Sequence, residues 1–331
     1  MTRASAALLC ALVLLLGGRP GRAQDFTSRA VGTAGSEFLN LDVGPRGIAM
    51  GGAYSAIVSD AYSMYWNPAG LSRVPRLSLA AMHNEYLAGI RMQYLAYAQR
   101  LNEHSVLAGG LRFMDAGEID HTDVNGNAQG SFRPRNYVYE FGWGQSIADL
   151  TDAEHDVSLG LTGRYFHSDL LAHANGYAGD VGIQTHYTET AMPFSFSFVA
   201  QNMGSGQKFD YVRDTLPFRA RLGAALNPIP QALLSMEAVF PVSNDPFGAV
   251  GAELGLDAPN GVKGFLRGGF NTLNQFSGLD GFKGLSLGVG LKLINLTVDY
   301  SFVPFGMLGE THRFSLCWDL PAKHSRRFRA R

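Results

Sequence analysis

The chain has 331 residues, a formal net charge of −1 at pH 7, 40 glycines and 11% aromatic residues. The near balance of charge excludes the basic field that a nucleic-acid-binding protein needs. Frequent glycine without a collagen period is typical of curved strands rather than of a disordered chain. After the first 23 residues, no apolar run approaches the roughly 20 residues of a transmembrane helix.

Residues 1–23 have the three parts of a secretory signal peptide. Arg3 supplies the positive end, Ala6–Leu16 form an apolar core too short to span a bilayer, and Ala23 is a small residue before a cleavage site. We therefore exclude this segment from the fold. Cys317 is then the only cysteine of the exported chain, so it has no partner for an internal disulfide and we expect a packed side chain.

Residues 24–74 do not alternate as strands do. They contain a Gly-Pro-Arg-Gly turn at 44–47, a run of small residues from Ala49 to Val58, and a Trp-Asn-Pro-Ala-Gly break at 66–70. A compact, glycine-rich segment ahead of a long strand series is typical of a plug inside a barrel. We predict that residues 24–74 form an N-terminal hatch, with Gly51 and Gly52 packed closely against the barrel wall.

The rest of the chain alternates with the period of two that strands require. About fourteen segments have the length that crosses a membrane as a strand, roughly 9–11 residues each, and bacterial barrels have an even number of strands. We predict one all-β domain over residues 75–320, a transmembrane antiparallel β-barrel of about 14 strands with the hatch inside it. The segments lie near 76–84, 90–101, 104–115, 136–147, 156–169, 176–189, 193–202, 217–227, 231–240, 248–257, 262–271, 284–293, 295–303 and 310–320.

Each predicted strand has one apolar and one polar face. In Tyr137–Gly144 the aromatic residues occupy one face, and in Gly284–Leu293 leucine and valine alternate with serine, glycine and lysine. We interpret the polar face as a narrow, hydrogen-bonded lumen around a plug. The alternative is the solvated face of a soluble sandwich, which would rarely be so rich in glycine. The polar face carries isolated charges of both signs: Arg112, Glu140, Arg164, Glu237, Glu253, Lys263 and Arg267.

Both ends of the exported chain resemble the PorV/PorQ family of outer-membrane proteins. The N-terminal pieces are Gly44-Pro45-Arg46-Gly47, Met50-Gly51-Gly52-Ala53, Ser59-Asp60-Ala61 and Tyr65-Trp66-Asn67-Pro68-Ala69-Gly70-Leu71. The C-terminal pieces are Asp299-Tyr300-Ser301-Phe302-Val303-Pro304-Phe305-Gly306, Leu308-Gly309 and Thr311-His312-Arg313. This family is similar to the FadL long-chain fatty-acid transporters, so the resemblance implies a fourteen-stranded outer-membrane barrel with an N-terminal hatch.

The resemblance implies two different functions. PorV-like proteins bind the C-terminal signal domains of secreted cargo and shuttle that cargo in type IX protein secretion to the surface attachment machinery. FadL-like proteins transport hydrophobic small molecules across the outer membrane. The expected partners are outer-membrane lipid, the type IX translocon and cargo C-terminal domains, or a hydrophobic ligand or detergent in the lumen. A purely structural barrel is a third alternative.

Two groups of hatch residues are candidate site residues. The hatch motif comprises Gly44, Arg46, Gly47, Met50, Gly51, Gly52, Asp60, Trp66, Asn67, Pro68, Ala69 and Gly70. Within it, Asn67-Pro68 either gates a passage or forms a rigid turn that anchors the hatch, because proline restricts both its own backbone and that of the preceding residue. A transporter would also need an apolar cavity beside the hatch, with candidate lining residues Phe38, Leu39, Met50, Tyr54 and Tyr62.

Nothing in the sequence indicates catalysis. The nine histidines lack metal-ligand spacing, no nucleophile and base can be paired, and Gly51-Gly52 does not follow a strand of a dinucleotide-binding unit. We predict no enzyme, no metal and no cofactor. Residues 321–331 form a short basic tail that we expect in the periplasm, either disordered or touching anionic lipid or a partner.

Overall fold

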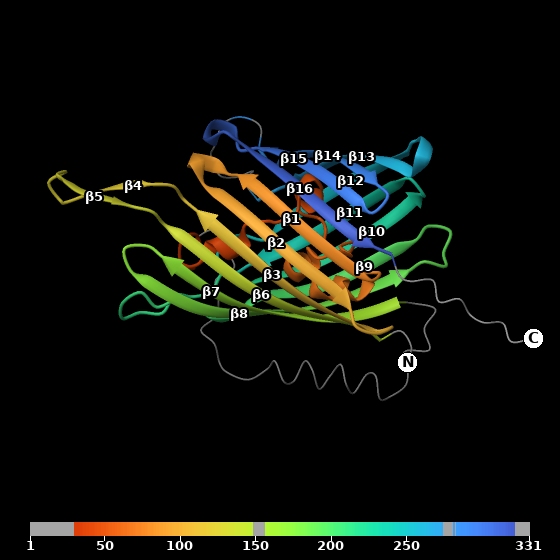
Figure 1. Cartoon of the computed structure of the whole chain (residues 1–331), viewed down its shortest axis with the longest axis horizontal. Coiled ribbons are helices and arrows are strands. Elements are labelled where there is room, and N and C mark those ends of the chain that lie inside the picture. The colour runs from red at the N-terminus through yellow and green to blue at the C-terminus, as the bar shows by residue number, and fades with distance from the viewer. Residues whose placement is uncertain (1–29, 148–155, 274–280, 282, 322–331) are drawn as a thin grey trace, which may run out of the picture.

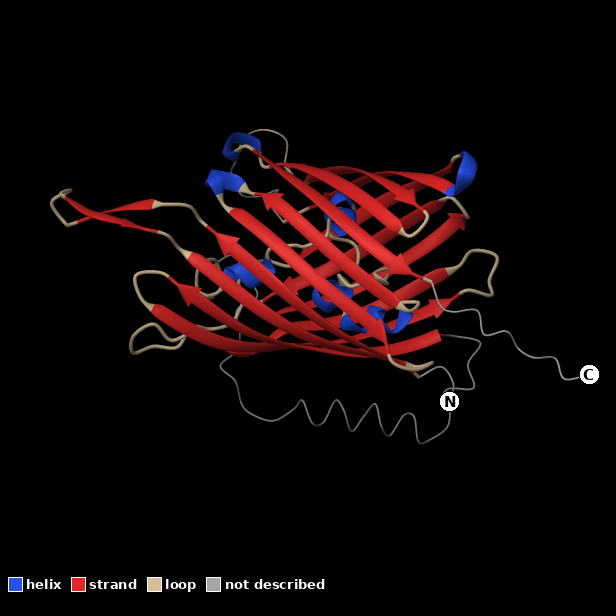
Figure 2. Cartoon of the chain, in the orientation of Figure 1, coloured by secondary structure: helices blue, strands red, loops and turns tan. Residues whose placement is uncertain are grey.

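A closed antiparallel barrel of fourteen strands surrounds a series of short N-terminal helices (Figures 1 and 2). The computed structural model describes residues 30–147, 156–273, 281 and 283–321. The all-β barrel of fourteen strands predicted from the sequence is confirmed. The predicted signal peptide and all but the first residue of the basic tail lie outside the described residues. None of the described helices is long and apolar enough to cross a membrane.

Each barrel strand pairs with its neighbours along the chain, and the last strand pairs with the first to close the barrel. The barrel strands are β1 (Leu77–Glu85), β2 (Arg91–Arg100), β3 (Ser105–Asp115), β6 (Arg135–Ser146), β7 (Asp156–Asp169), β8 (His173–Tyr187), β9 (Phe194–Ser205), β10 (Arg219–Ile229), β11 (Ala232–Pro241), β12 (Phe247–Asp257), β13 (Val262–Asn271), β14 (Leu285–Leu293), β15 (Leu296–Pro304) and β16 (Glu310–Leu320).

Among the described residues the helices are all short. Four lie ahead of the barrel: η2 (Glu37–Asn40), α2 (Pro45–Ala49), α3 (Ser63–Trp66) and η3 (Pro68–Arg73). Pro45 and Pro68 stand at the first positions of α2 and η3, where the fixed proline backbone suits a helix start and no backbone donor is lost. Three 3₁₀ turns lie in strand connections: η4 (Leu87–Gly89), η6 (Pro259–Gly261) and η7 (Gly306–Leu308).

The two ends of the barrel differ in their connections. The end where β1 begins and β16 ends has short turns, such as residues 230–231 and 294–295, whereas residues 116–134 and 206–218 form longer connections at the other end. Barrels of this kind have short periplasmic turns and longer extracellular loops. We therefore assign the end where β1 begins and β16 ends to the periplasm and the other to the outside (Figure 1).

Residues 116–134, which lie between two predicted strands, contain two additional strands. β4 (Ile119–Thr122) and β5 (Ala128–Phe132) form a hairpin within residues 116–134 that projects from the outer end (Figure 1). Its turn is closed by the Asp123 carboxylate, which accepts hydrogen bonds of 2.8 Å from the backbone N–H groups of Asn125 and Asn127. Gly126 supplies the positive φ, 83°. Local turn chemistry therefore forms a hairpin in a connection for which the sequence pattern predicts no strand.

The outer face of the barrel is apolar. Large hydrophobic side chains on it are exposed, for example Leu95, Phe141, Leu222, Met236 and Leu316. Their neighbours along each strand point inward and are buried, because successive side chains of a strand alternate between faces. An exposed apolar belt around a whole molecule is compatible with lipid and not with water.

Candidate functional site

The interior of the barrel is occupied by residues 37–74, which we call the lumen segment. Its helices lie within the ring of strands in Figure 2, and it hydrogen-bonds to side chains of β7, β9, β11, β12 and β14 and to the backbone of β8. The largest buried side chain of the described residues, Trp66, lies in this segment and donates a 2.7 Å hydrogen bond to the Val43 carbonyl.

Three inward-facing glycines form a flat surface under residues 67–72, with Gly160 and Gly182 under the Asn67–Ala69 turn and Gly144 under Leu71 and Ser72. Gly144, Gly160 and Gly182 stand directly opposite one another on β6, β7 and β8. A Cβ on Gly160 would overlap with the backbone of Pro68 and Ala69, and one on Gly182 would overlap with the Asn67 side-chain oxygen. Backbone atoms cannot rotate aside, so the turn can lie this close only to glycine. We call these three residues the first glycine platform.

Asn67 fastens this turn to the wall and to the lumen segment. Its Nδ2 donates to the carbonyl of Ser55 (2.9 Å) and to that of Ile183 on β8 (3.2 Å), and its Oδ1 accepts from the Ala69 N–H (3.1 Å). The side chain is completely buried. All three groups of the amide are thus used in holding the turn, which is the geometry that the anchoring alternative for Asn67-Pro68 requires.

A second glycine platform lies on the opposite flank. Gly251 and Gly269 stand opposite each other on β12 and β13, in contact with Met50 and Gly51 of the lumen segment. Gly51 itself has a φ of 70°, and a Cβ there would lie 2.7 Å from the Phe270 backbone nitrogen. Gly52 follows with a φ of 87°. Gly51 is therefore required both by its left-handed backbone and by close packing against the wall. Gly52 is required by its left-handed backbone alone, because a Cβ there would meet only the Trp66 ring, at 3.9 Å, and not the wall.

Arg46 links the lumen segment to an ion-pair chain on the wall. Its Nη2 lies 2.7 Å from Glu253, which also binds Arg267 at 2.5 Å, and Arg267 in turn lies 2.6 Å from Asp299. The two arginines and two carboxylates neutralise one another. Such alternation lets four charges occupy a largely dehydrated interior.

A second buried carboxylate holds the middle of the lumen segment. Glu237 on β11 accepts from the backbone N–H groups of Tyr54 (2.9 Å) and Ser55 (3.0 Å) and pairs with Arg221 on β10. Arg221 also donates to the Gly52 carbonyl at 2.7 Å. The wall therefore binds the backbone of the lumen segment through charge-assisted hydrogen bonds.

A third cluster lies on β3, β6, β7 and β8. Glu140 binds Arg112 at 2.8 Å and Arg164 at 2.9 Å, and Arg164 also pairs with Asp180 at 2.5 Å. All four side chains are at most 2% exposed. Tyr94 donates to the second Glu140 oxygen at 2.8 Å. The isolated lumen charges expected from the sequence are thus assembled into compact neutral groups.

The candidate hatch-motif residues lie in one segment but at separate places on the wall. Arg46 contacts β12, Met50 and Gly51 lie on the second glycine platform, and Asn67 and Pro68 lie on the first. The remaining members pack within the lumen segment or border its periplasmic side: Gly44 against Tyr62, Gly47 against Tyr54 and Trp66, Gly52 near Trp66, Gly70 against Val58 and Ser63, Ala69 under the Asn67 cap, and Asp60 beside a periplasmic cavity.

The five candidate ligand-lining residues are not brought together. Phe38 and Leu39 pack with Val138 and Phe166. Met50 belongs to a second cluster, and Tyr54 and Tyr62 belong to a third. The five residues are close in sequence and lie on one segment. The turns of that segment direct their side chains to different parts of the wall.

The wall residues that hold the lumen segment were only partly visible in the sequence. The isolated charges were found from their inward positions, and six of the seven are buried. Lys263 differs, because it lies at the periplasmic mouth with its side chain 55% exposed and pairs with Asp257 at 3.0 Å. The glycine platforms were missed. The only sign of the platforms in the sequence is glycine at inward-facing positions, and the curvature of the barrel strands by itself also explains glycine at such positions.

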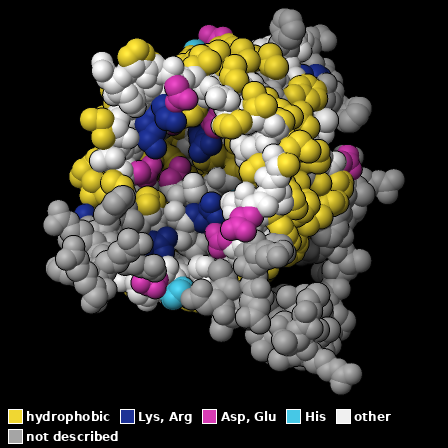
Figure 3. Space-filling view, turned by 90° about the vertical axis from the view of Figure 1, so that its right-hand side faces the viewer, with side chains coloured by type: hydrophobic (Ala, Val, Ile, Leu, Met, Phe, Trp, Pro, Cys, Tyr) yellow, Lys and Arg dark blue, Asp and Glu magenta, His cyan; other side chains and the backbone are white. Residues whose placement is uncertain are grey.

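The periplasmic end is hollowed into two adjoining cavities of about 420 and 310 Å³. They share Arg46, Ser59, Arg73 and Phe265 as lining residues. Figure 3 shows this end with basic and acidic side chains gathered in the hollow. Both cavities therefore present a mixed, charged lining to the periplasm.

Asp60 borders the smaller cavity, and its titration provides a test of this environment. Burial, and next the charge of Asp319, raise the pKa of Asp60 to about 7 from 3.8. A raised pKa in the folded protein favours the protonated form, so the contribution of Asp60 to stability is greatest below pH 4 and is lost as the pH rises toward 7. We expect Asp60→Asn to remove this loss of stability. The variant should unfold at the same temperature as the wild type at pH 4 and at a higher temperature than the wild type at pH 8.

The measurement is thermal unfolding in detergent at both pH values. The control is Asp257→Asn, since Asp257 is 63% exposed at the same end of the barrel. If the difference in unfolding temperature between the wild type and Asp60→Asn is the same at pH 4 and at pH 8, the buried environment assigned to Asp60 is wrong.

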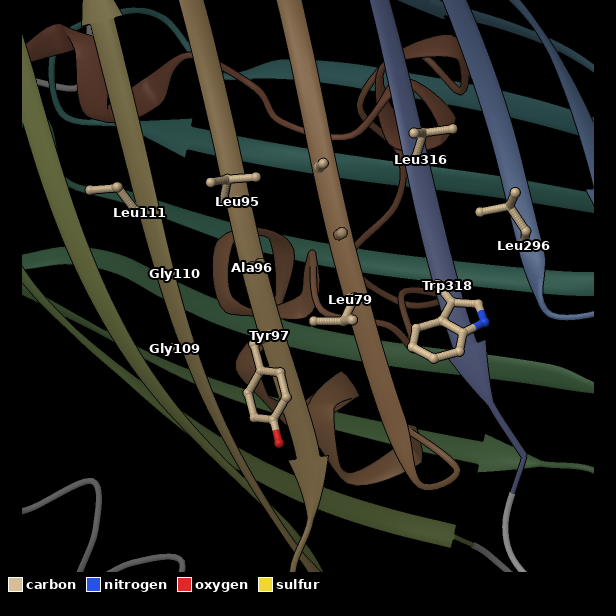
Figure 4. A pocket seen from close by; sticks show the side chains of 12 residues that line it. Leu79, Leu95, Ala96, Tyr97, Gly109, Gly110, Leu111, Leu296, Leu316 and Trp318 are labelled. Carbon is tan, nitrogen blue, oxygen red and sulfur yellow. The ribbon is translucent and has the colours of Figure 1, made fainter.

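An apolar groove of about 640 Å³ lies on the outside of the barrel. Figure 4 shows its lining side chains on β1, β2, β3, β15 and β16. Ala81 forms part of its floor between Leu95 and Leu316, its partners on the neighbouring strands, and Tyr97 and Trp318 flank Leu79 in the same way. The groove belongs to the apolar belt and faces lipid.

The family model of the type IX secretion system protein PorV matches residues 23–229. The match covers the lumen segment and the first half of the barrel. The chain belongs to the PorV family. It is thus a type IX secretion outer-membrane barrel, and the family resemblance predicted from the sequence is confirmed. The match begins at the residue that precedes the expected mature N-terminus. No curated protein matches the chain.

Solved structures agree at the level of the fold. The Ralstonia pickettii toluene transporter TbuX is 12% identical, with a TM-score of 0.54, over 84% of this chain and 98% of that chain. A mutant of the monoaromatic hydrocarbon channel TodX is 10% identical, with a TM-score of 0.53, over 84% and 99%. This PorV-family chain therefore has the FadL-like barrel that the sequence predicted.

Proposed function

We propose that this barrel binds secreted cargo through the cargo's C-terminal signal domain and shuttles it, in type IX secretion, to the surface attachment machinery. The observation that carries the proposal is the PorV-family match over residues 23–229. In the same proposal, residues 24–74 act as the hatch, residues 75–320 as the barrel and residues 321–331 as a periplasmic tail.

The fastening of the lumen segment supports a binding role over conduction. Two glycine platforms, the Asn67 amide and ion pairs from Arg46 hold the segment in contact with the wall. In this proposal the barrel acts through its surfaces rather than through a passage in its interior. The outer surface offers the β4–β5 hairpin, whose strands pair only with each other and so leave edges that can accept another strand.

The experiment is affinity purification of the tagged barrel from detergent-solubilised outer membrane, with mass spectrometry of what co-purifies. We expect secreted proteins that share a C-terminal domain, and the translocon. Replacing residues 117–133 by a short turn should weaken cargo recovery. A substitution of Gln231, in the periplasmic β10–β11 turn, is the control. It leaves the outer hairpin intact and should leave cargo recovery unchanged. A barrel that purifies with neither cargo nor export components would refute the proposal.

Transport of hydrophobic small molecules is the second candidate. It is favoured by the FadL-like fold, which this chain has in common with the toluene transporter TbuX and the hydrocarbon channel TodX. The same purified barrel, extracted with organic solvent, tests it. A stoichiometric fatty acid or hydrocarbon in the extract, with no cargo in the pull-down, would favour transport. No enzymatic activity is proposed.

A further inference from the structure

The β4–β5 hairpin projects from the outer end of the barrel as a separate sheet of two strands (Figure 1). Within the part of the chain that the structure describes, β4 and β5 pair only with each other, so each strand has one free edge. A free edge presents backbone N–H and C=O groups without strand partners, and these groups can pair with another strand. The two edges of the hairpin are not equivalent.

The edge of β5 is interrupted by a bulge. Ala128 stands opposite Thr122 and Gly130 stands opposite His121, so Gln129 is an extra residue on β5. Gly130 has a φ of 108°, which residues with a side chain rarely adopt. A bulge bends its strand and disrupts the pairing pattern, and it is one of the devices that protect sheet edges. The bulge therefore disfavours the addition of a strand to β5.

The edge of β4 is regular, because residues 119–122 pair with β5 without an extra residue of their own. Just beyond β4, the N–H of Asp123 donates to the carbonyl of Asn127 at 2.9 Å inside the hairpin. Backbone groups of successive residues in a strand point alternately to its two edges. Those of Thr122 and Asp120 therefore point to the free edge, where a partner strand can pair with both.

The free edge of β4 is acidic on one face. Asp120 is exposed and forms no ion pair with any described residue. Ser131, which stands opposite Asp120, donates a hydrogen bond to the Glu118 carboxylate, so the two acids lie on the same face. Arg133, the only lysine or arginine of the hairpin, is paired with Asp115 of β3 at 2.8 Å. A strand that adds to this edge therefore meets uncompensated negative charge.

The other face of the same edge is apolar. Ile119 is 43% exposed and stands opposite Phe132 of β5. The Phe132 ring packs edge-on against His121, with 6.2 Å between the ring centroids. A partner strand places every second side chain over this face and the others over the acidic face. Apolar residues at the first positions would cover Ile119, and basic residues at the second would face Glu118 and Asp120.

We propose that the free edge of β4 accepts an extended segment of the secreted cargo in which apolar residues alternate with lysine or arginine. The proposal rests on the cargo-binding function proposed above, and it names the edge and the chemistry of the segment. A second copy of this chain fits the edge poorly. Antiparallel pairing of two β4 strands that joins their apolar faces also brings Glu118 and Asp120 of one copy against those of the other, and like charges directly opposite destabilise a sheet.

The test uses the full-length barrel in detergent and two short fluorescent peptides. Valine alternates with lysine in the first peptide and with glutamate in the second. Fluorescence anisotropy should show saturable binding of the valine–lysine peptide and much weaker binding of the valine–glutamate peptide. Equal binding of the two peptides would overturn the proposal. Unchanged binding to a barrel in which a short turn replaces residues 117–133 would also overturn it, because the peptide would then bind the micelle or another surface.

Thr122→Pro distinguishes edge pairing from general attraction to acidic groups. Proline removes the outward N–H that a partner strand needs and leaves both acids in place, so the valine–lysine peptide should bind about tenfold more weakly. Ser131→Pro is the matched control, because the N–H of Ser131 points to the free edge of β5. This control should bind the peptide as the wild type does. Unchanged binding by Thr122→Pro, or equal weakening by both substitutions, would count against β4 as the docking edge.

Asp120→Lys tests the role of charge. The substitution should weaken binding of the valine–lysine peptide by up to about fivefold, the effect of one cross-strand charge pair. It should also strengthen binding of the valine–glutamate peptide, which a hairpin that had merely unfolded would not do. An unchanged preference for the valine–lysine peptide in Asp120→Lys would overturn the proposal.

Cargo recovery distinguishes the failure of this proposal from the failure of the function on which it rests. Affinity purification with Thr122→Pro should recover less cargo than purification with the wild type. Full recovery with Thr122→Pro would refute the role of the β4 edge and leave cargo binding intact, whereas a wild-type barrel without cargo would refute cargo binding itself. A wild-type barrel that sediments as a dimer, with Thr122→Pro as a monomer, would assign the edge to a second copy and overturn the proposal.

Discussion

Gly160→Val is expected to displace the Asn67–Ala69 turn from the barrel wall and to expose the lumen segment to protease. A Cβ at Gly160 would overlap with the backbone of Pro68 and Ala69. Ordinary overpacking of a core costs about 1–3 kcal/mol because side chains shift; here the overlapping atoms are backbone, so the segment itself has to move. Trypsin should then cleave after Arg46 and Arg73, which in the wild type are held by Glu253 and Asp156.

Gly163→Val is the matched control for this prediction. Gly163 lies three residues further along the same strand on the outer face, and a Cβ there would meet no atom within 4 Å. The control should resist trypsin as the wild type does. Equal resistance of Gly160→Val would mean that the turn is not seated on the first glycine platform.

Glu140→Gln is expected to destabilise the folded barrel by about 3–5 kcal/mol, the usual cost of leaving buried charge uncompensated. Glu140 bonds both Arg112 and Arg164, and with Asp180 it balances their two positive charges. The amide would leave one net positive charge among side chains that are at most 2% exposed. Urea-induced unfolding, followed by the loss of folded-barrel mobility in electrophoresis, measures the change.

The control for Glu140→Gln is Glu85→Gln. Glu85 pairs with Arg91 at 3.3 Å, but both side chains are about half exposed, and exposed pairs contribute only about 0–1 kcal/mol. Adding Arg112→Met to Glu140→Gln should recover part of the stability, because it removes the excess charge. Equal effects of Glu140→Gln and Glu85→Gln would indicate that water reaches the Glu140 cluster.

The sequence by itself determined the class of fold and the inward or outward side of most strand residues. A strand has a side-chain period of two, so Arg112, Glu140 and Arg164 were placed on the lumen face from their neighbours alone. The number of strands followed from segment length and turn positions. The N-terminal motifs identified the segment that enters the barrel and the family to which the chain belongs.

Only the tertiary structure decided which residues meet. Whether Gly160 faces Gly182, or Arg313 faces Asn84, depends on the register between strands, which local sequence does not encode and which a slip of one residue would invert. The candidate lining residues show the same limit, because the turns of the lumen segment send Leu39, Met50 and Tyr62 to three separate clusters. Alternation along a strand is a local property of the chain, whereas a glycine platform or an ion-pair cluster exists only where strands from distant parts of the chain are held side by side.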